Sequence, residues 1–442
     1  MKIYIYKILF FTSVVATLAS CEVQEFNDLN NAEVDAFEEN LTRGDLQDLV
    51  GGIFYSSRVN IGTYLDDCGV VGREYWRFSG SDPRFTSDLL GGANSGLDNN
   101  TFYITNPWAS RYRTIKNANL ILGFLNNQDL SAQFTDAEVS ATRGLLKTYI
   151  GYELLLNLNL TDENGIRVDV ADENNLGPFV SKDQALVGIL AYLQDGANDL
   201  ANGSDAFPFI MPSGFTGFNA PDTFLQANKA ISARVAAYQK DFNAVLSFLD
   251  DSFLNLDPND LNTGVYYNFS EDQTGLVNPL FISVNGTSAA QARIVEPNFV
   301  SDSLTGDNRL NKIVQLSEPI TLDNLTGDHI VFRYPDNDVD IPIIRNEELI
   351  LLYAEANITI NPAEAVNAIN IIRNSADLEP YTGPTDTESL TDEMLLQRRY
   401  SLFAEGHRWI DMRRYNRLDE LPLARPDDDV FSQFPIPLTE NQ

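Results

Sequence analysis

The chain has 442 residues, and its 63 aspartates and glutamates outnumber its 30 lysines and arginines, for a net charge of −33. Because binding of nucleic acid requires a basic surface that meets the phosphates, this balance excludes a nucleic-acid-binding protein. A chain of this length can bury a core large enough to hold the fold without disulfides, and only two cysteines are present.

The first twenty residues have the pattern of a secretory signal peptide. Lys2 and Lys7 form a short basic region, and the apolar run 8–18 that follows is too short to span a bilayer as a mature helix. The run closes in Leu-Ala-Ser-Cys, which resembles a bacterial lipobox whose cysteine, here Cys21, is lipidated. We therefore predict a signal peptide, a lipid anchor on Cys21 and an acidic tether over 21–40; a plain secretory signal is the alternative.

Residues 41–442 are expected to be mainly α-helical, as one large domain or two closely packed ones. Apolar residues recur every three or four positions in several segments, the spacing typical of helices with one buried face. Helical signals begin at Leu41, and the strongest segments are 107–128, 136–158, 183–200, 224–253 and 346–378. We expect the first of these to begin at Pro107, and either Thr135 or Asp136 to cap the second.

The segments 224–253 and 346–378 have the pattern of helical hairpins, and 107–158 is a third helix pair. Small residues, mostly alanine, recur at helical spacing and would let antiparallel helices approach closely, with turns at Lys240-Asp241 and Asn361-Pro362. The arrangement resembles tetratricopeptide repeats, although the full repeat consensus is absent. We predict a helical-repeat scaffold; any alanine-rich hairpin would show the same spacing.

Residues 60–106 and 257–343 have a different character. They are rich in Gly, Asn, Asp, Pro and aromatic residues and show no sustained period. We predict long loops with short strands, and long loops in a compact protein usually carry function.

The stretch "RRYSLFAEGHRWIDMRR", residues 398–414, places His407 between the carboxylates Glu405 and Asp411. Two carboxylates across a cleft are the requirement for glycoside hydrolysis. However, the surrounding arginines should lower carboxylate pKa values, whereas a general acid needs a raised one. We therefore expect a polar brace between helices, with Arg408 pairing with Asp411 three residues on. Further partners are expected from Glu347, Glu348 and Glu355.

The same stretch resembles the C-terminal signature of the SusD/RagB family of outer-membrane nutrient-binding lipoproteins, Glu-Gly-x-Arg-Trp-x-Asp-Leu-x-Arg after an arginine. The matching residues are Arg398, Glu405, Gly406, Arg408, Trp409, Asp411 and Arg414. Gln397 and Ser401 stand where acidic residues are usual, and Met412 replaces leucine. Weaker matches along the chain include Trp108, Tyr112, Ile115, Asn119, Asp307, Arg309, Arg345, Glu348, Tyr353, Ala354, Glu355 and Ala356.

The resemblance implies a non-catalytic lipoprotein on the outer face of a Gram-negative outer membrane. Members of the family pair with a SusC-like TonB-dependent transporter, which they cover as a hinged lid. Their helical scaffold carries loops that bind oligosaccharides, or peptides in some branches. For this chain it implies a SusD-like domain over residues 41–442 and ligand loops at 60–106 and 257–343.

Sugar binding requires flat aromatic rings for the C–H face of the sugar, and donors and acceptors for its hydroxyls. The segment 64–85 offers both kinds of group, and 257–343 adds two tyrosines. The predicted ligand-binding residues are Asp67, Arg73, Glu74, Tyr75, Trp76, Tyr266 and Tyr267. The alternative is that the aromatic residues of these loops pack onto the scaffold. Trp108 and Trp409 lie at core spacing in helical segments.

The sequence therefore predicts a cell-surface glycan-binding protein that delivers its ligand to a transporter. Peptide capture on the helical repeats is an alternative, and a secreted glycan-cleaving enzyme is another. No catalytic residue, metal or cofactor is predicted. The only two histidines, His329 and His407, lie far apart in the sequence, so a histidine metal cluster is not expected.

Overall fold

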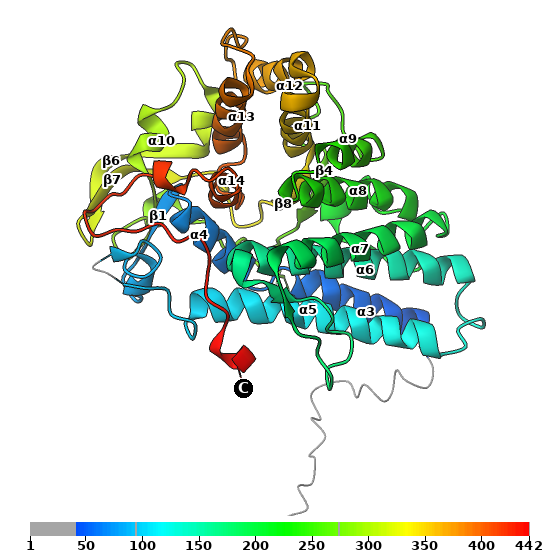
Figure 1. Cartoon of the computed structure of the whole chain (residues 1–442). Helices are drawn as coiled ribbons and strands as arrows, with labels where there is room; N and C mark the ends of the chain where they lie inside the picture. The colour runs from blue at the N-terminus through cyan, green and yellow to red at the C-terminus, as the bar shows by residue number, and fades with distance from the viewer. Residues whose placement is uncertain (1–40, 93–94, 273–274, 442) are drawn as a thin grey trace, which may run out of the picture.

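The computed structural model describes residues 41–92, 95–272 and 275–441. The predicted signal peptide, Cys21 and the tether lie outside this part of the chain. Helices make up most of it (Figure 1). Their bounds are α3 Arg43–Ser56, α4 Ile61–Val71, α5 Phe102–Asn127, α6 Asp136–Thr161, α7 Lys182–Ala201, α8 Pro221–Tyr238, α9 Phe242–Asp250, α10 Pro297–Ser301, α11 Asn346–Ile360, α12 Pro362–Ser375, α13 Thr387–Ser401 and α14 Arg408–Arg414.

The strands are short and form three small antiparallel sheets. They are β1 Tyr75–Ser79, β2 Ile166–Arg167, β3 Phe179–Val180, β4 Gly264–Tyr267, β5 Gln291–Val295, β6 Ile313–Leu322, β7 Leu325–Val331 and β8 Ile341–Arg345. One sheet has the order β1-β5-β7-β6, and the other two pair β2 with β3 and β4 with β8. Five of the eight strands, β4 to β8, come from 257–343, which agrees with the predicted loops and short strands.

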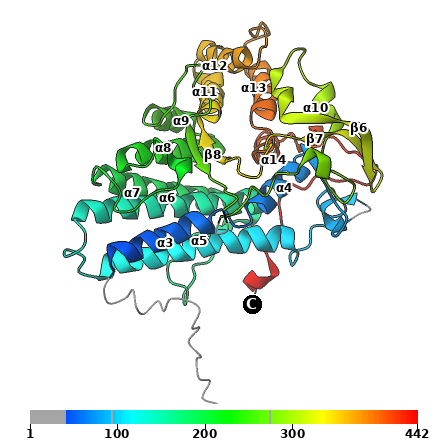
Figure 2. The ribbon, with the colours of Figure 1, turned by 180° about the vertical axis from the view of Figure 1, so that it is seen from behind.

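Consecutive helices pack as hairpins, which confirms the predicted mainly helical scaffold. Helices α5 to α8 lie side by side, with α3 packed alongside α5, and α11 to α13 form a second group (Figure 1); Figure 2 shows both from behind. Helices α8 and α9 pack against α11 and so join the two groups. The turns fall at Lys240 and Asn361, as expected; Lys240 adopts a positive φ of 59°.

Small residues let these helices approach closely. A Cβ on Gly144 of α6 would lie 2.8 Å from the carbonyl oxygen of Gly196 in α7, so no larger residue fits there without a shift. The alanines of α8 are fully buried for the same reason. Thr135, not Asp136, caps α6, and its side chain and that of Glu138 form a reciprocal capping box.

Helix α4 was not predicted, because residues 60–106 were expected to be loops and strands. Ten of its eleven residues are buried, so the helix has no polar face that would reveal a period. Its Asp66 pairs with Arg293 of β5 through two hydrogen bonds of 2.7 and 2.8 Å. Such a contact, across 227 residues, cannot be read from local sequence.

Helix α5 begins at Phe102, five residues before the predicted start at Pro107. Pro107 therefore lies in the second turn. Lacking an N–H, it removes one backbone hydrogen bond there without ending the helix.

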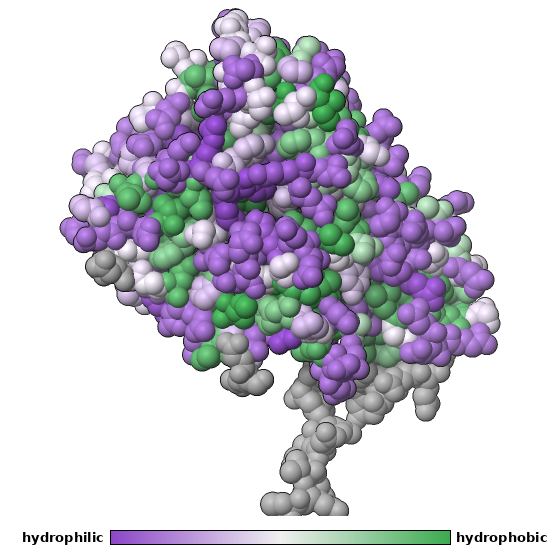
Figure 3. All heavy atoms as spheres, in the orientation of Figure 1, coloured by the Kyte–Doolittle hydropathy of each residue, from purple (hydrophilic) through white to green (hydrophobic). Residues whose placement is uncertain are grey.

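The pairing of β1 with β5 joins two segments that are far apart in the sequence. Tyr75 lies opposite Val295, and Trp76 lies opposite Ile294. The face of the molecule in Figure 3 is mostly hydrophilic, with apolar residues in small separate groups, as the acidic composition leads one to expect. Among the described residues, none of the helices combines the length and the apolar character that crossing a bilayer requires.

Candidate ligand-binding site

The carboxylates of the C-terminal stretch are ion-paired in the interior. Glu405 accepts hydrogen bonds from Arg345 at 3.0 and 3.1 Å and from Arg333 at 3.1 Å. Burial by itself would raise the pKa of Glu405, but Arg345 and Arg333 outweigh it and hold this pKa at about 2. A carboxyl group with such a pKa is ionised at neutral pH and cannot serve there as a general acid.

Asp411 has a similar environment. It accepts from Arg398 at 2.7 Å and from Arg414 at 3.0 Å, and not from Arg408 as expected. Burial opposes ionisation, but Arg398 and Arg414 hold the pKa of Asp411 at about 2. Arg408 instead faces a surface groove with Leu395 and Met412.

Further ion pairs connect this stretch to other helices. Arg414 donates to Glu355 of α11 at 2.7 Å, and Arg234 of α8 donates to Glu348 of α11 at 2.6 and 2.7 Å. His407 Nε2 lies 3.8 Å from Glu348, and burial lowers the pKa of His407 to about 4, so the imidazole is neutral at pH 7. Four helices, α8, α11, α13 and α14, and strand β8 therefore meet at one polar brace.

Gly406 allows the chain to turn inside this brace. Its φ is +82°, a conformation that side chains with a Cβ rarely adopt, and a Cβ would lie 3.0 Å from Leu65. The glycine thus separates α13 from α14 and places Glu405 beside Arg345.

Five of the predicted ligand-binding residues lie in the core. The exposed fractions of Asp67, Arg73, Glu74, Tyr75 and Trp76 are between 0% and 3%. The aromatic residues of strand β1 belong to the hydrophobic core, where they pack against apolar neighbours. In this structure a ligand at the surface does not reach these five side chains.

Their polar groups have internal roles. Arg73 donates to the backbone oxygen of Leu90 at 3.1 Å. Tyr75 donates to the backbone oxygen of Leu65 at 3.1 Å. Glu74 accepts from the backbone N–H of Ala404 at 3.2 Å, and burial raises the pKa of Glu74 to about 8.

The two predicted tyrosines of β4 point to opposite faces of the strand, as neighbours in a strand do. Tyr267 is buried beside Tyr152, with ring centroids 6.4 Å apart. Tyr266 is half-buried and borders an open pocket. Of the seven predicted residues, Tyr266 is the one that borders this pocket.

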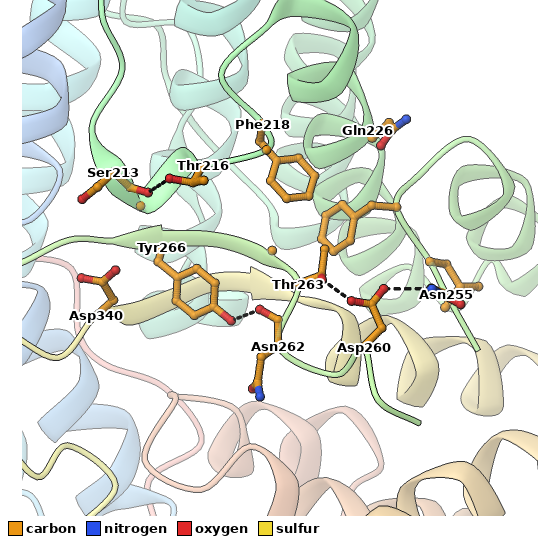
Figure 4. Close-up of a pocket in the computed structure, with 15 residues that line it drawn as sticks. Ser213, Thr216, Phe218, Gln226, Asn255, Asp260, Asn262, Thr263, Tyr266 and Asp340 are labelled. Carbon is orange, nitrogen blue, oxygen red and sulfur yellow. Dashed lines mark hydrogen bonds between the residues drawn. The ribbon is translucent and has the colours of Figure 1, made fainter. Parts of the chain in front are cut away.

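The pocket has a volume of about 720 Å³ and lies between the segment 213–218, the loop 253–263 and strand β4 (Figure 4). Its lining residues are Ser213, Gly214, Thr216, Gly217, Phe218, Gln226, Phe253, Leu254, Asn255, Asp260, Asn262, Thr263, Gly264, Tyr266 and Asp340. A volume of this size accommodates a small ligand or a few sugar rings.

Hydrogen bonds fix the loop that forms one wall. Asp260 accepts from Asn255 at 2.9 Å and from the Thr263 hydroxyl, and Tyr266 donates its hydroxyl to the backbone oxygen of Asn262 (Figure 4). Behind the wall, buried Asn346 exchanges hydrogen bonds with the backbone of Asn255, at 2.6 and 2.9 Å. The wall is thus anchored to the first residue of α11.

The segment 213–218 forms the opposite wall. Gly214 approaches β4 so closely that a Cβ there would lie 2.2 Å from the backbone oxygen of Tyr266. Phe218 and Phe253 meet edge to face at a centroid distance of 4.8 Å and supply the apolar part.

The pocket combines aromatic carbon with uncharged donors and acceptors. Its lining contains two carboxylates, Asp260 and Asp340, and neither lysine nor arginine. Burial raises the pKa of Asp340, which also accepts from the backbone N–H of Phe269 at 3.3 Å. This chemistry suits hydroxyl-rich, uncharged molecules and repels anions.

Most of this lining was not predicted from the sequence. Ser213, Thr216 and Phe218 lie in the segment between α7 and α8, which has no period and carries several glycines and prolines, the composition of a shaped loop. That composition was the available signal. It could not show that the segment meets β4.

Part of the chain matches a known protein family in sequence. The family model described as "SusD family" matches residues 323–433. A SusD-like protein from Formosa agariphila is 35% identical over 94 residues, a match that spans 19% of this chain and 19% of that relative. The matched part is thus about a fifth of the relative's length.

Solved structures extend the likeness to most of the chain. A SusD superfamily protein from Bacteroides vulgatus has a TM-score of 0.70 at 15% identity and covers 91% of this chain and 97% of its own. A SusD homolog from Bacteroides thetaiotaomicron has a TM-score of 0.66 at 16% identity, covering 93% and 97%. A laminarin binding SusD-like protein has a TM-score of 0.62 at 14% identity, covering 89% and 97%.

The matched residues 323–433 contain β8, α11, α13, α14 and the brace except for Arg234 of α8. This C-terminal part matches the SusD family in sequence, and the chain shares the fold of SusD superfamily structures over about nine-tenths of its length.

Proposed function

We propose that the protein binds an uncharged glycan in the pocket around Tyr266 and passes it to a SusC-like transporter. The observation that carries this proposal is the pocket itself, where an aromatic ring borders an open volume of about 720 Å³ lined by amides, hydroxyls and two carboxylates, with no lysine or arginine. Pyranose rings require this combination, because their C–H faces pack on aromatic carbon while their hydroxyls need donors and acceptors.

The relatives support the same class of ligand. One structural neighbour is described as a laminarin binding protein, and another, from Bacteroides vulgatus, as a SusD-like carbohydrate binding protein. Because sequence identity to both is low, the likeness concerns the fold. The ligand of this chain is therefore inferred from its own pocket. The absence of basic residues from the pocket lining favours uncharged glycans over uronic acids or sulfated sugars.

Anchoring at the cell surface through Cys21 and delivery to a transporter are parts of the proposal that rest on the lipobox pattern and the family. The soluble body would then be held at the membrane by its acidic N-terminal segment.

The third part of the proposal is that the protein binds its ligand without cleaving it. The carboxylates that could have acted as an acid–base pair, Glu405 and Asp411, are engaged with arginines in the interior. In the pocket, Asp260 already accepts hydrogen bonds from Asn255 and Thr263. Glu405 and Asp411 therefore offer no accessible acid with a raised pKa.

Affinity electrophoresis of the soluble chain, from Glu22 onward, tests the proposal. Migration should be retarded in gels that contain a neutral polysaccharide such as laminarin or a soluble α-glucan, and not in gels with anionic alginate. Tyr266→Ala should remove the retardation, whereas the exposed Tyr55→Ala, on α3, should not change it. Release of new reducing ends would point to an enzyme, and displacement of the glycan by peptides would point to peptide capture.

A further inference from the structure

A second groove lies far from Tyr266 along helix α5. It has a volume of about 480 Å³ and is bounded by the side of α5 and by the segment between β2 and β3. Leu120, Gly123 and Phe124 form its apolar floor, with Val170 and Ala171 on the opposite side. Their spacing along α5 places them on one stripe of the helix.

The segment that forms the outer wall is attached to α5. Tyr112 donates to the backbone oxygen of Arg167 at 2.8 Å, and Asn119 donates to that of Val170 at 3.4 Å. Lys116 pairs with Glu173 at one end of the groove. The groove is therefore a fixed feature of the scaffold and not an opening between loose segments.

The described chain starts at the other end of this groove. Gln128, which lines it, accepts a hydrogen bond of 3.0 Å from the backbone N–H of Leu41. Leu41 is fully buried, and Thr42 caps α3 immediately afterwards. The first described residue of the chain thus lies beside the groove.

We propose that residues 33–40 of this chain occupy the groove, with Phe37 on its apolar floor. Within the acidic stretch "EVDAFEEN", Val34 and Phe37 are the large apolar residues, spaced three apart. Burial of an aromatic side chain against apolar residues is favourable, which favours docking over exposure to water.

The length of chain between Phe37 and Leu41 is sufficient for Phe37 to reach the floor of the groove. Phe37 precedes Leu41 by four residues, which span about 6 Å in a helix and up to about 14 Å when extended. The groove follows α5 from Gln128 to Lys116, about 18 Å at 1.5 Å per residue. Either conformation places Phe37 over the stripe of Leu120, Gly123 and Phe124.

Docking would shorten the tether of the proposed lipid anchor. Twenty residues separate Cys21 from Leu41 and reach up to about 70 Å when extended, whereas the twelve from Cys21 to Glu33 reach only about 40 Å. The docked segment would hold the body closer to the membrane and limit its rotation. This consequence depends on the anchor at Cys21; the docking itself does not.

Digestion of the soluble chain from Glu22 with a glutamate-specific protease tests the docking. We expect rapid cleavage after Glu25 and at least tenfold slower cleavage after Glu33, Glu38 and Glu39, followed by mass spectrometry of the N-terminal peptides. Gly123→Leu fills the floor, since a Cβ at Gly123 meets no atom within 4 Å, and should remove the protection. Leucine has the higher helix propensity, so this variant should fold.

Phe37→Ser should likewise remove the protection, and Phe26→Ser, upstream of the docked part, should not. Equal cleavage after Glu25, Glu33 and Glu38 in the unaltered chain would overturn the proposal. Protection that persists in both Gly123→Leu and Phe37→Ser would also overturn it. If Gly123→Leu instead abolished glycan or peptide binding while cleavage stayed the same, the groove would be a ligand site and not a tether site.

Discussion

Arg345 and Glu405 face each other in the interior through two hydrogen bonds, of 3.0 and 3.1 Å, although sixty residues separate them in the sequence. Arg345 is the last residue of β8, which pairs with β4 so that Gly264 lies opposite Arg345 and Tyr266 opposite Pro342. The C-terminal stretch therefore supports the strand that carries Tyr266. The paired strands β4 and β8 therefore connect the polar brace to the proposed binding pocket.

Loss of this pair should destabilise the fold strongly. Glu405→Gln would leave Arg345 and Arg333 without their carboxylate, and removing one partner of a buried ion pair typically costs about 3–5 kcal/mol. We expect the free energy of unfolding in urea to fall by that amount, whereas Glu318→Gln, at an exposed position of β6, should change it by less than about 0.5 kcal/mol. Equal denaturation midpoints for the two variants would contradict the structural role of Glu405.

Acid should destabilise the protein in two ranges of pH. His407 has a pKa of about 4 when folded and 6.5 when unfolded, so its contribution is lost as the pH falls from 6.5 to 4. Glu405, with a folded pKa of about 2 against 4.5, loses its contribution as the pH falls from 4.5 to 2. Unfolding followed by circular dichroism across pH 2–8 measures both ranges. Glu405→Gln should reduce the loss in the lower range, where Asp411 still contributes, and leave the upper one unchanged. An equal loss in both proteins across the lower range would count against this assignment.

Glu74 should lower the stability of the fold as the pH rises, which is opposite to the effect of Glu405 and His407. Its pKa is raised from 4.5 to about 8, so folding requires this group to take up a proton, and stability is lost as the pH rises from 4.5 to 8. Glu74→Gln removes this cost and keeps an oxygen that can accept from Ala404. We expect a gain of about 1–3 kcal/mol at pH 8 that disappears at pH 4. A loss of stability at both pH values would show that Glu74 is ionised in the fold.

Substitution of Gly214 should weaken ligand binding more than it lowers the free energy of unfolding. Gly214→Ala places a Cβ 2.2 Å from the backbone oxygen of Tyr266, so the wall must move away from β4. We expect weaker retardation in gels that contain the bound glycan, with a change of at least tenfold in affinity. Gly286→Ala is the matched control, since its Cβ would meet only Ser283 at 3.8 Å. Equal affinity of the two variants would place the ligand elsewhere.

The helical scaffold could be predicted because its signals are local. The alanines of 224–253, the turn at Asn361-Pro362 and the apolar spacing of 136–158 each lie within a few turns of helix. Helix α4 could not be predicted in this way, because it is buried on all sides and its polar residues pair with distant partners.

The binding pocket was harder to predict for the same reason. Tyr75 and Tyr266 look alike in the sequence, each beside another aromatic residue in an aperiodic segment. Strand pairing distinguishes them: β1 pairs with β5 in the core, which buries Tyr75, whereas β4 pairs with β8 beside the pocket, which leaves Tyr266 half-buried. Sequence chemistry identified the kinds of residue, and tertiary pairing decided which of them a ligand can reach.

The most direct test is the affinity of the soluble chain for a neutral glycan, measured by affinity electrophoresis with and without Tyr266→Ala. We expect the unaltered protein to be retarded by at least one neutral glycan with no release of reducing ends, and Tyr266→Ala to migrate as it does in the gel without glycan. Retardation that Tyr266→Ala leaves unchanged, or no retardation by any neutral glycan, would contradict the proposed site.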